Sequence, residues 1–77
     1  MSHDLNKADI KILTKLTEGR NLPQNIANDF EYTRQYIHNR LQMLSAAGYV
    51  ENIGGGLYEL TDDGRTALGQ EGGDNEE

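Results

Sequence analysis

Amide, imidazole and guanidinium side chains recur along the segment 33–47, which has the spacing of an amphipathic helix. At about 100° per residue, Leu41 and Leu44 fall close to Ile37 and form its inner face. The opposite face is polar and carries Gln35, Asn39 and Gln42, with His38 at its shoulder. An amide offers the donor and acceptor pair that matches adenine, and Arg matches guanine or a phosphate. This face therefore favours contact with base edges in the major groove of double-stranded DNA.

The candidate DNA-contacting residues lie on this helix, apart from one glycine in the turn that follows it. They are Thr33, Arg34, Gln35, Tyr36, His38, Asn39, Arg40, Gln42 and Gly55. Arg34 and Arg40 flank the buried face on opposite sides, and Tyr36 could either bond a phosphate or pack beside Arg40. On an isolated helix, such a polar face is more often only a solvated surface. The neighbouring elements therefore decide between the two interpretations.

Two helices are predicted ahead of this segment. Asn6 can cap the first helix, with Asp9 placed in its first turn, and Gly19 is a stop signal. Pro23 suits the first turn of a second, short helix that runs to Phe30, because its missing N–H has no helical partner there. The spacing predicts a helix–turn–helix unit.

A hairpin is predicted after the third helix, which Thr33 caps and Gly48 ends. Residues 49–53 and 57–60 have the pattern of two strands, and Gly54–Gly56 permit the positive φ angles of a tight turn. The turn lacks Lys and Arg, so the hairpin is expected to add little charge to a DNA contact. The alternative is a hairpin that only closes the core.

The end of the chain is acidic and rich in glycine. Thr61 can cap a short last helix that reaches Leu68, with Asp62 and Asp63 in its first turn. The segment 69–77 has no apolar residue, so we expect a disordered acidic tail after a single domain formed by residues 1–68.

Composition limits the possible classes of protein. The chain has 77 residues, 35% hydrophobic content and no Cys, which allows one small core and neither a disulfide nor a thiolate metal site. The absence of long apolar runs predicts no membrane partner and a cytoplasmic location. The net charge of −6 argues against DNA, but four of the 13 acidic residues lie in the last seven positions. An acidic balance with three lysines also resembles proteins of salt-loving archaea, although an ordinary acidic domain has the same composition.

Enzymatic chemistry is not expected from these residues. His3 and His38 are far apart in the chain and lack a matching set of acidic ligands, so no metal or other cofactor is predicted. No GK[ST] follows the glycines at 54–56, which excludes a phosphate-binding loop of that kind. Asp62 and Asp63 are better explained as acids at a helix start than as a catalytic pair.

As a whole, the chain resembles the small winged-helix regulators of haloarchaea that are called phage-repressor-like proteins. The matching stretches are DIKILTKL and NLPQNIANDFEYTRQYIHNRLQMLSAAGYVENIGGGLYELTDDGR, which span about 9–65. The resemblance implies a transcriptional regulator that is expected to act as a repressor. It places Arg34, Gln35, His38 and Asn39 at the recognition positions. The turn GGG departs from the Lys- or Arg-bearing turns common among such proteins.

The expected fold is α+β and mostly α: a winged helix-turn-helix with three helices, a two-stranded hairpin wing and a short C-terminal helix. The expected function is binding of double-stranded DNA to regulate transcription, with a homodimer possible and no small-molecule effector evident. The alternative is a winged-helix module that binds proteins and not DNA, which the acidic balance and the uncharged hairpin turn favour.

Overall fold

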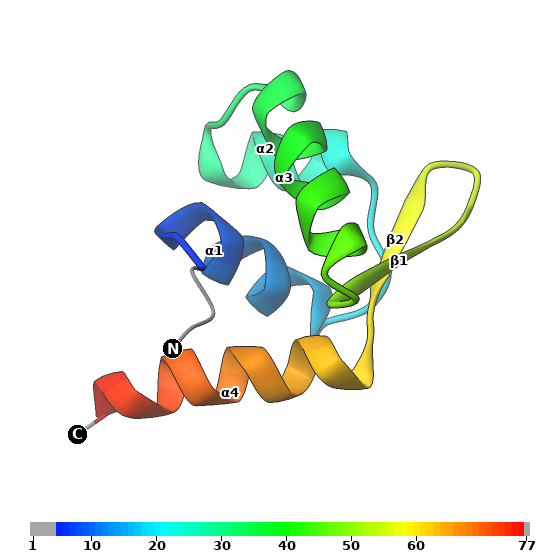
Figure 1. Cartoon of the computed structure of the whole chain (residues 1–77). Helices are drawn as coiled ribbons and strands as arrows, with labels where there is room; N and C mark the ends of the chain where they lie inside the picture. The colour runs from blue at the N-terminus through cyan, green and yellow to red at the C-terminus, as the bar shows by residue number, and fades with distance from the viewer. Residues whose placement is uncertain (1–4, 77) are drawn as a thin grey trace.

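Four helices and one antiparallel hairpin make up the computed structural model, which describes residues 5–76 and the side chains as far as Gly69 (Figure 1). The elements are α1 Lys7–Leu16, α2 Pro23–Phe30, α3 Arg34–Ala46, β1 Val50–Gly54, β2 Leu57–Leu60 and α4 Asp62–Glu76. The predicted class, α+β and mostly helical, is confirmed. In the described part of the chain, no helix is long and apolar enough to cross a membrane.

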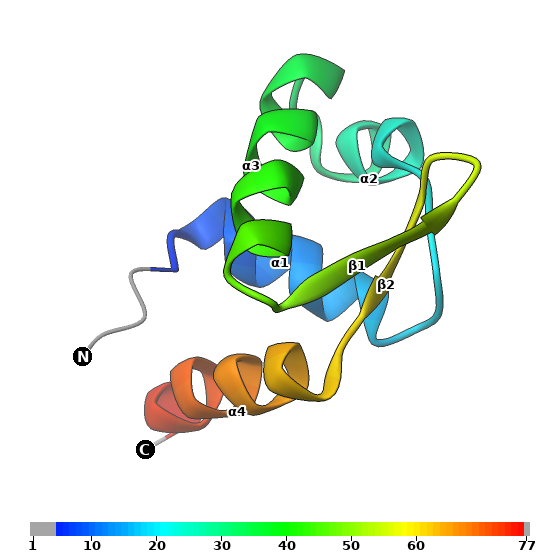
Figure 2. The same cartoon turned by 45° about the vertical axis from the view of Figure 1, so that its right-hand side comes forward.

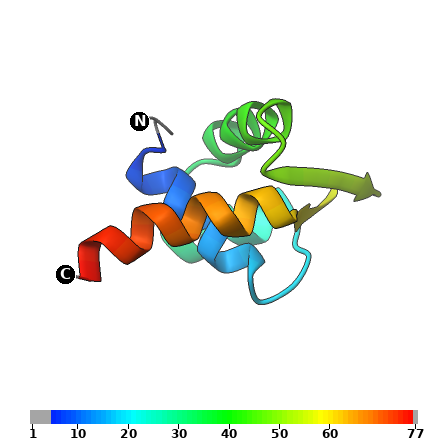
Figure 3. The ribbon, with the colours of Figure 1, turned by 60° about the horizontal axis from the view of Figure 1, so that its bottom comes forward.

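Helix α1 lies at the centre, between α3 and α4 (Figures 1 and 3). Its start is fixed by a capping box: the Asp9 N–H donates to the Asn6 side chain at 2.7 Å, and the Asn6 N–H donates to the Asp9 carboxylate at 3.1 Å. Ile12, Leu13 and Leu16 are buried at helical spacing. The helix can contact several elements because this apolar stripe is wide.

Helices α2 and α3 are joined by a turn at Glu31, which has a left-handed φ of 62°. The Thr33 hydroxyl then accepts the Tyr36 N–H at 3.0 Å and caps α3, as predicted. Ile37, Leu41 and Leu44 are buried on the inner face of α3, which confirms that assignment. The outer face of α3 is consequently turned to solvent.

The hairpin pairs Val50 with Leu60 and Asn52 with Tyr58, and an irregularity follows Asn52. All three turn glycines have positive φ angles, as the sequence predicted. Asn21, in the segment between α1 and α2, adds a bridge to Tyr58 through two backbone hydrogen bonds of 3.0 and 2.9 Å. This bridge ties β2, near the turn of the hairpin, to the segment that precedes the helix–turn–helix unit (Figure 2).

Helix α4 corrects one prediction. The sequence placed its end at Leu68, before a disordered tail over 69–77, whereas the helix continues to Glu76. Glycine and acidic residues lower helix propensity, but they keep the backbone donors and acceptors that extend a helix. Glu77 lies outside the described residues. The helix packs on α1 through its first turns, where Gly64 and Ala67 are buried.

Candidate functional site

The outer face of α3 is exposed and polar, as the sequence predicted. Its amides form two bonds along the helix: Gln35 donates to Asn39 at 3.3 Å, and Gln42 lies 3.2 Å from the His38 ring nitrogen. These are spacings of one helical turn, so each pair points in the same direction from the helix. No Asp or Glu occurs between Glu31 and Glu51, although the chain has 13 acidic residues. The longest helix with fully described side chains is therefore free of carboxylates.

A groove of about 420 Å³ opens beside this face, between α3, the start of α2 and the hairpin. Its described lining residues are Leu22, Pro23, Gln24, Arg34, Gln35, His38, Asn52, Gly56 and Tyr58. None of them is acidic. Glu51 and Glu59 face each other across the hairpin, and strand alternation directs them away from the side that carries Asn52 and Tyr58. The lining surface of the groove is more apolar than polar, and Arg34 is its cation.

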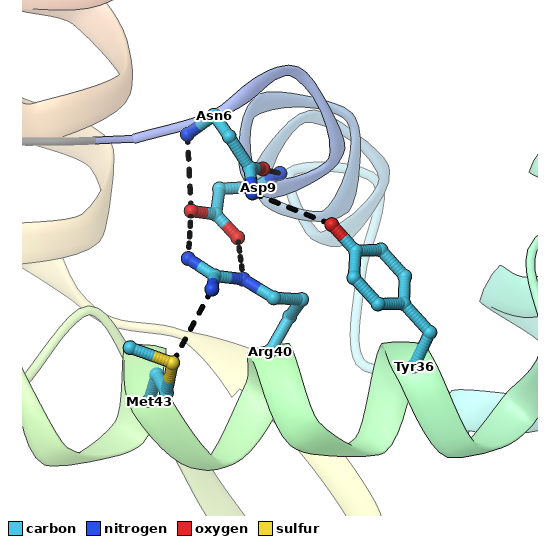
Figure 4. Close-up of polar contacts among 5 residues, drawn as sticks. All are labelled: Asn6, Asp9, Tyr36, Arg40 and Met43. Carbon is cyan, nitrogen blue, oxygen red and sulfur yellow. Dashed lines mark hydrogen bonds and ion pairs between the residues drawn. The ribbon is translucent and has the colours of Figure 1, made fainter.

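Arg40 has a different role from the expected DNA contact. Its Nε and Nη2 donate to the two Asp9 carboxylate oxygens at 2.8 and 2.6 Å, and Nη1 donates to the Met43 sulfur at 3.3 Å (Figure 4). The Asp9 side chain is 1% exposed and that of Arg40 is 20% exposed. The hydrogen bond to Asp9 raises the pKa of Arg40. This guanidinium fastens α3 to α1.

Tyr36 and Thr33 also use their polar groups within the protein. The Tyr36 hydroxyl accepts from the Asn6 amide at 3.3 Å (Figure 4). The Tyr36 ring lies 5.3 Å from that of Tyr32. Of the two roles left open for Tyr36, the structure favours packing on the Arg40 side of the helix. The Thr33 hydroxyl is occupied by the cap of α3.

Two of the lysines on α1 make specific contacts with neighbouring elements. Lys15 pairs with Asp29 at 2.6 Å and with Glu18 at 3.5 Å, and the hydrogen bond to Asp29 raises the pKa of Lys15. Lys11 lies over the Phe30 and Tyr32 rings, at 5.7 and 5.6 Å from their centroids. These cations bind α1 to the α2–α3 unit and are not among the described lining residues of the groove.

The structure brings together part of the predicted site. Arg34, Gln35 and His38 line the groove, while Asn39 and Gln42 are exposed on the same helix. Gly55 lies at the turn of the hairpin and is not a lining residue of the groove. The sequence analysis missed Asn52 and Gln24, which line it. Strand alternation pairs Asn52 with Tyr58, but the contact of that strand face with α3 requires the fold.

In the described part of the chain, no group of three or more His, Cys, Asp or Glu residues could hold a metal ion. No family model matches this sequence, and a search of the curated proteins found no match.

Proposed function

We propose that this chain is a winged helix-turn-helix protein that binds double-stranded DNA and regulates transcription. The observation that carries the proposal is the outer face of α3, which exposes amides and an imidazole and has no carboxylate in a chain of net charge −6. A helix face without carboxylates does not repel the phosphates of DNA, and base edges can pair with the donors and acceptors of its side chains.

The neighbouring elements support this use of α3. The helix begins at a capped turn after a short helix, and a hairpin stands beside it (Figure 2). In helix-turn-helix proteins, the early residues of the second helix meet the bases. Gln35 and Asn39 occupy such positions here. Occupancy of an operator would repress transcription, as the resemblance to haloarchaeal phage-repressor-like regulators implies, and a homodimer would match a two-fold operator.

The test is a selection of bound sequences from random duplex DNA, performed at high KCl, followed by titration of the enriched site. Alanine at Gln35 or Asn39 is expected to weaken binding to that site by about 1–3 kcal/mol and to leave binding to unrelated duplexes nearly unchanged. Ser45→Ala, on the exposed end of the same helix, is the matched control. Wild-type affinity in both amide variants would contradict the assignment of the face.

Failure to enrich any sequence, by a protein that is folded under the same conditions, would contradict DNA binding itself. The acidic composition would then favour the second candidate, a winged-helix module that binds proteins.

A further inference from the structure

We propose that the groove between α3 and the hairpin seats one phosphodiester of the DNA backbone between Arg34 and His38, and that binding takes up a proton on His38. This inference rests on the proposed DNA binding and adds a ligand, a pair of contact residues and a dependence on pH.

The size of the groove and the polar side chains at one part of its lining suit a backbone phosphate. A volume of about 420 Å³ exceeds that of one phosphate group and leaves room for the attached sugars. Arg34 and His38 are four residues apart on α3, so they lie one above the other on the same side of the helix. Two donors at that spacing can flank one anionic group. Gln24 and Asn52 add uncharged polar groups from α2 and the hairpin.

Few charges compete with these two residues. From α2, the described lining residues Leu22, Pro23 and Gln24 bring no titratable side chain, and from the hairpin only the Tyr58 phenol is titratable. The charged neighbour of His38 within the lining is Arg34, on the same helix. One permanent cation therefore faces the phosphate, and a protonated His38 would double the positive charge of the groove.

The surroundings of His38 can serve both of its charge states. Its ring nitrogen lies 3.2 Å from the Gln42 amide nitrogen, which can donate to a neutral imidazole. Rotation of the Gln42 amide by half a turn presents its oxygen, which can accept from an imidazolium. The proton comes from water, and no covalent bond to DNA forms. A phosphate beside the ring would favour the charged imidazolium.

The expected effect is a gain in DNA affinity as the pH falls. Uptake of one proton limits the slope to a tenfold gain per pH unit, and an exposed ring should gain roughly three- to tenfold in all between pH 8 and pH 5.5. The carboxylates of Asp and Glu remain largely ionised over this range, so they contribute little to the slope.

The experiment measures the affinity for the selected duplex from pH 5.5 to pH 8 at constant ionic strength, by fluorescence anisotropy. His38→Gln should bind with little dependence on pH. His3→Gln removes the other histidine and should keep the full dependence. Arg34→Gln should weaken binding at every pH. Calorimetry in two buffers of different ionisation enthalpy should show proton uptake by the wild type and not by His38→Gln.

Two results would overturn the inference while DNA binding stands: a flat profile in the wild type, or a slope that His38→Gln retains. If the groove binds a free anion and not the DNA backbone, inorganic phosphate should perturb the His38 ring signals in NMR. Duplex DNA should then fail to compete with phosphate for the groove. Absence of duplex binding at every pH would instead contradict the proposed function.

Discussion

Replacing Arg40 should damage stability and leave DNA recognition intact, although Arg40 lies on the helix that we propose enters the major groove. Arg40→Met removes the partner of Asp9, whose side chain is 1% exposed, and leaves that carboxylate with the Asn6 N–H. Breaking a buried ion pair in this way costs about 3–5 kcal/mol, because the remaining charge is desolvated and unpaired. Since the Arg40 side chain is 20% exposed, water can reach the pair, and we expect a value near 3 kcal/mol.

A loss of about 3 kcal/mol is a large part of the stability of a small domain and should lower the melting temperature by more than about 10 °C. The loss should persist at molar KCl, because a buried pair is screened much less than a surface pair. Urea denaturation followed by circular dichroism measures the free energy of unfolding. Arg34→Gln, on the exposed start of the same helix, should leave that free energy nearly unchanged and weaken DNA binding.

The double variant Asp9→Asn with Arg40→Met separates a lost charge pair from lost packing. It removes both charges and keeps an oxygen that can accept the Asn6 N–H, so it should recover most of the stability. At a temperature where all variants are folded, both Arg40 variants should bind DNA nearly as the wild type does. The reasoning is refuted if Arg40→Met loses less than about 1 kcal/mol, or if it keeps its stability and loses DNA binding.

Two further predictions follow from the fold and from the placement of the cations. Gly64→Ala should destabilise the domain by about 1–3 kcal/mol, because the added Cβ would lie 2.1 Å from the Tyr49 carbonyl oxygen. Gly69→Ala, which has open space around it, is the control and should be neutral or stabilising. Thermal denaturation measures both. DNA affinity should fall only shallowly with KCl. Each phosphate neutralised adds about 0.9 to the slope of the logarithm of the binding constant against the logarithm of the salt concentration. Arg34 is the one permanent cation among the described lining residues of the groove. A slope that corresponds to many phosphates per subunit would contradict that placement.

Local sequence signals predicted most of the fold because each acts within a few residues. Asn6 and Thr33 cap the helices that follow them, and Pro23 opens α2. The apolar spacing around Ile37 identified the buried face of α3, and thereby its exposed face. The predicted end of α4 was wrong because Gly69, which follows Leu68 like a stop signal, keeps a helical conformation and α4 continues past it.

Contacts between distant segments could not be predicted in the same way. The partner of Arg40 is Asp9, 31 positions earlier, and helical spacing indicates which side of α3 carries Arg40 but not what packs there. Asn21 and Tyr58 are likewise paired only by the fold. Asp9 was correctly placed in the first turn of α1, yet its second role, as the anchor of α3, depends on the packing of the two helices.

The distribution of cations explains how an acidic chain could recognise DNA. Arg40 and Lys15 form ion pairs between helices, and Lys11 lies over two aromatic rings, so these charges are engaged within the protein. Helix α3 exposes the amides of Gln35, Asn39 and Gln42, and bonds from amides to base edges would not release counterions. Binding built in this way gains less from general attraction to phosphates and depends more on the sequence of bases. High salt would then weaken nonspecific binding more than binding to the operator.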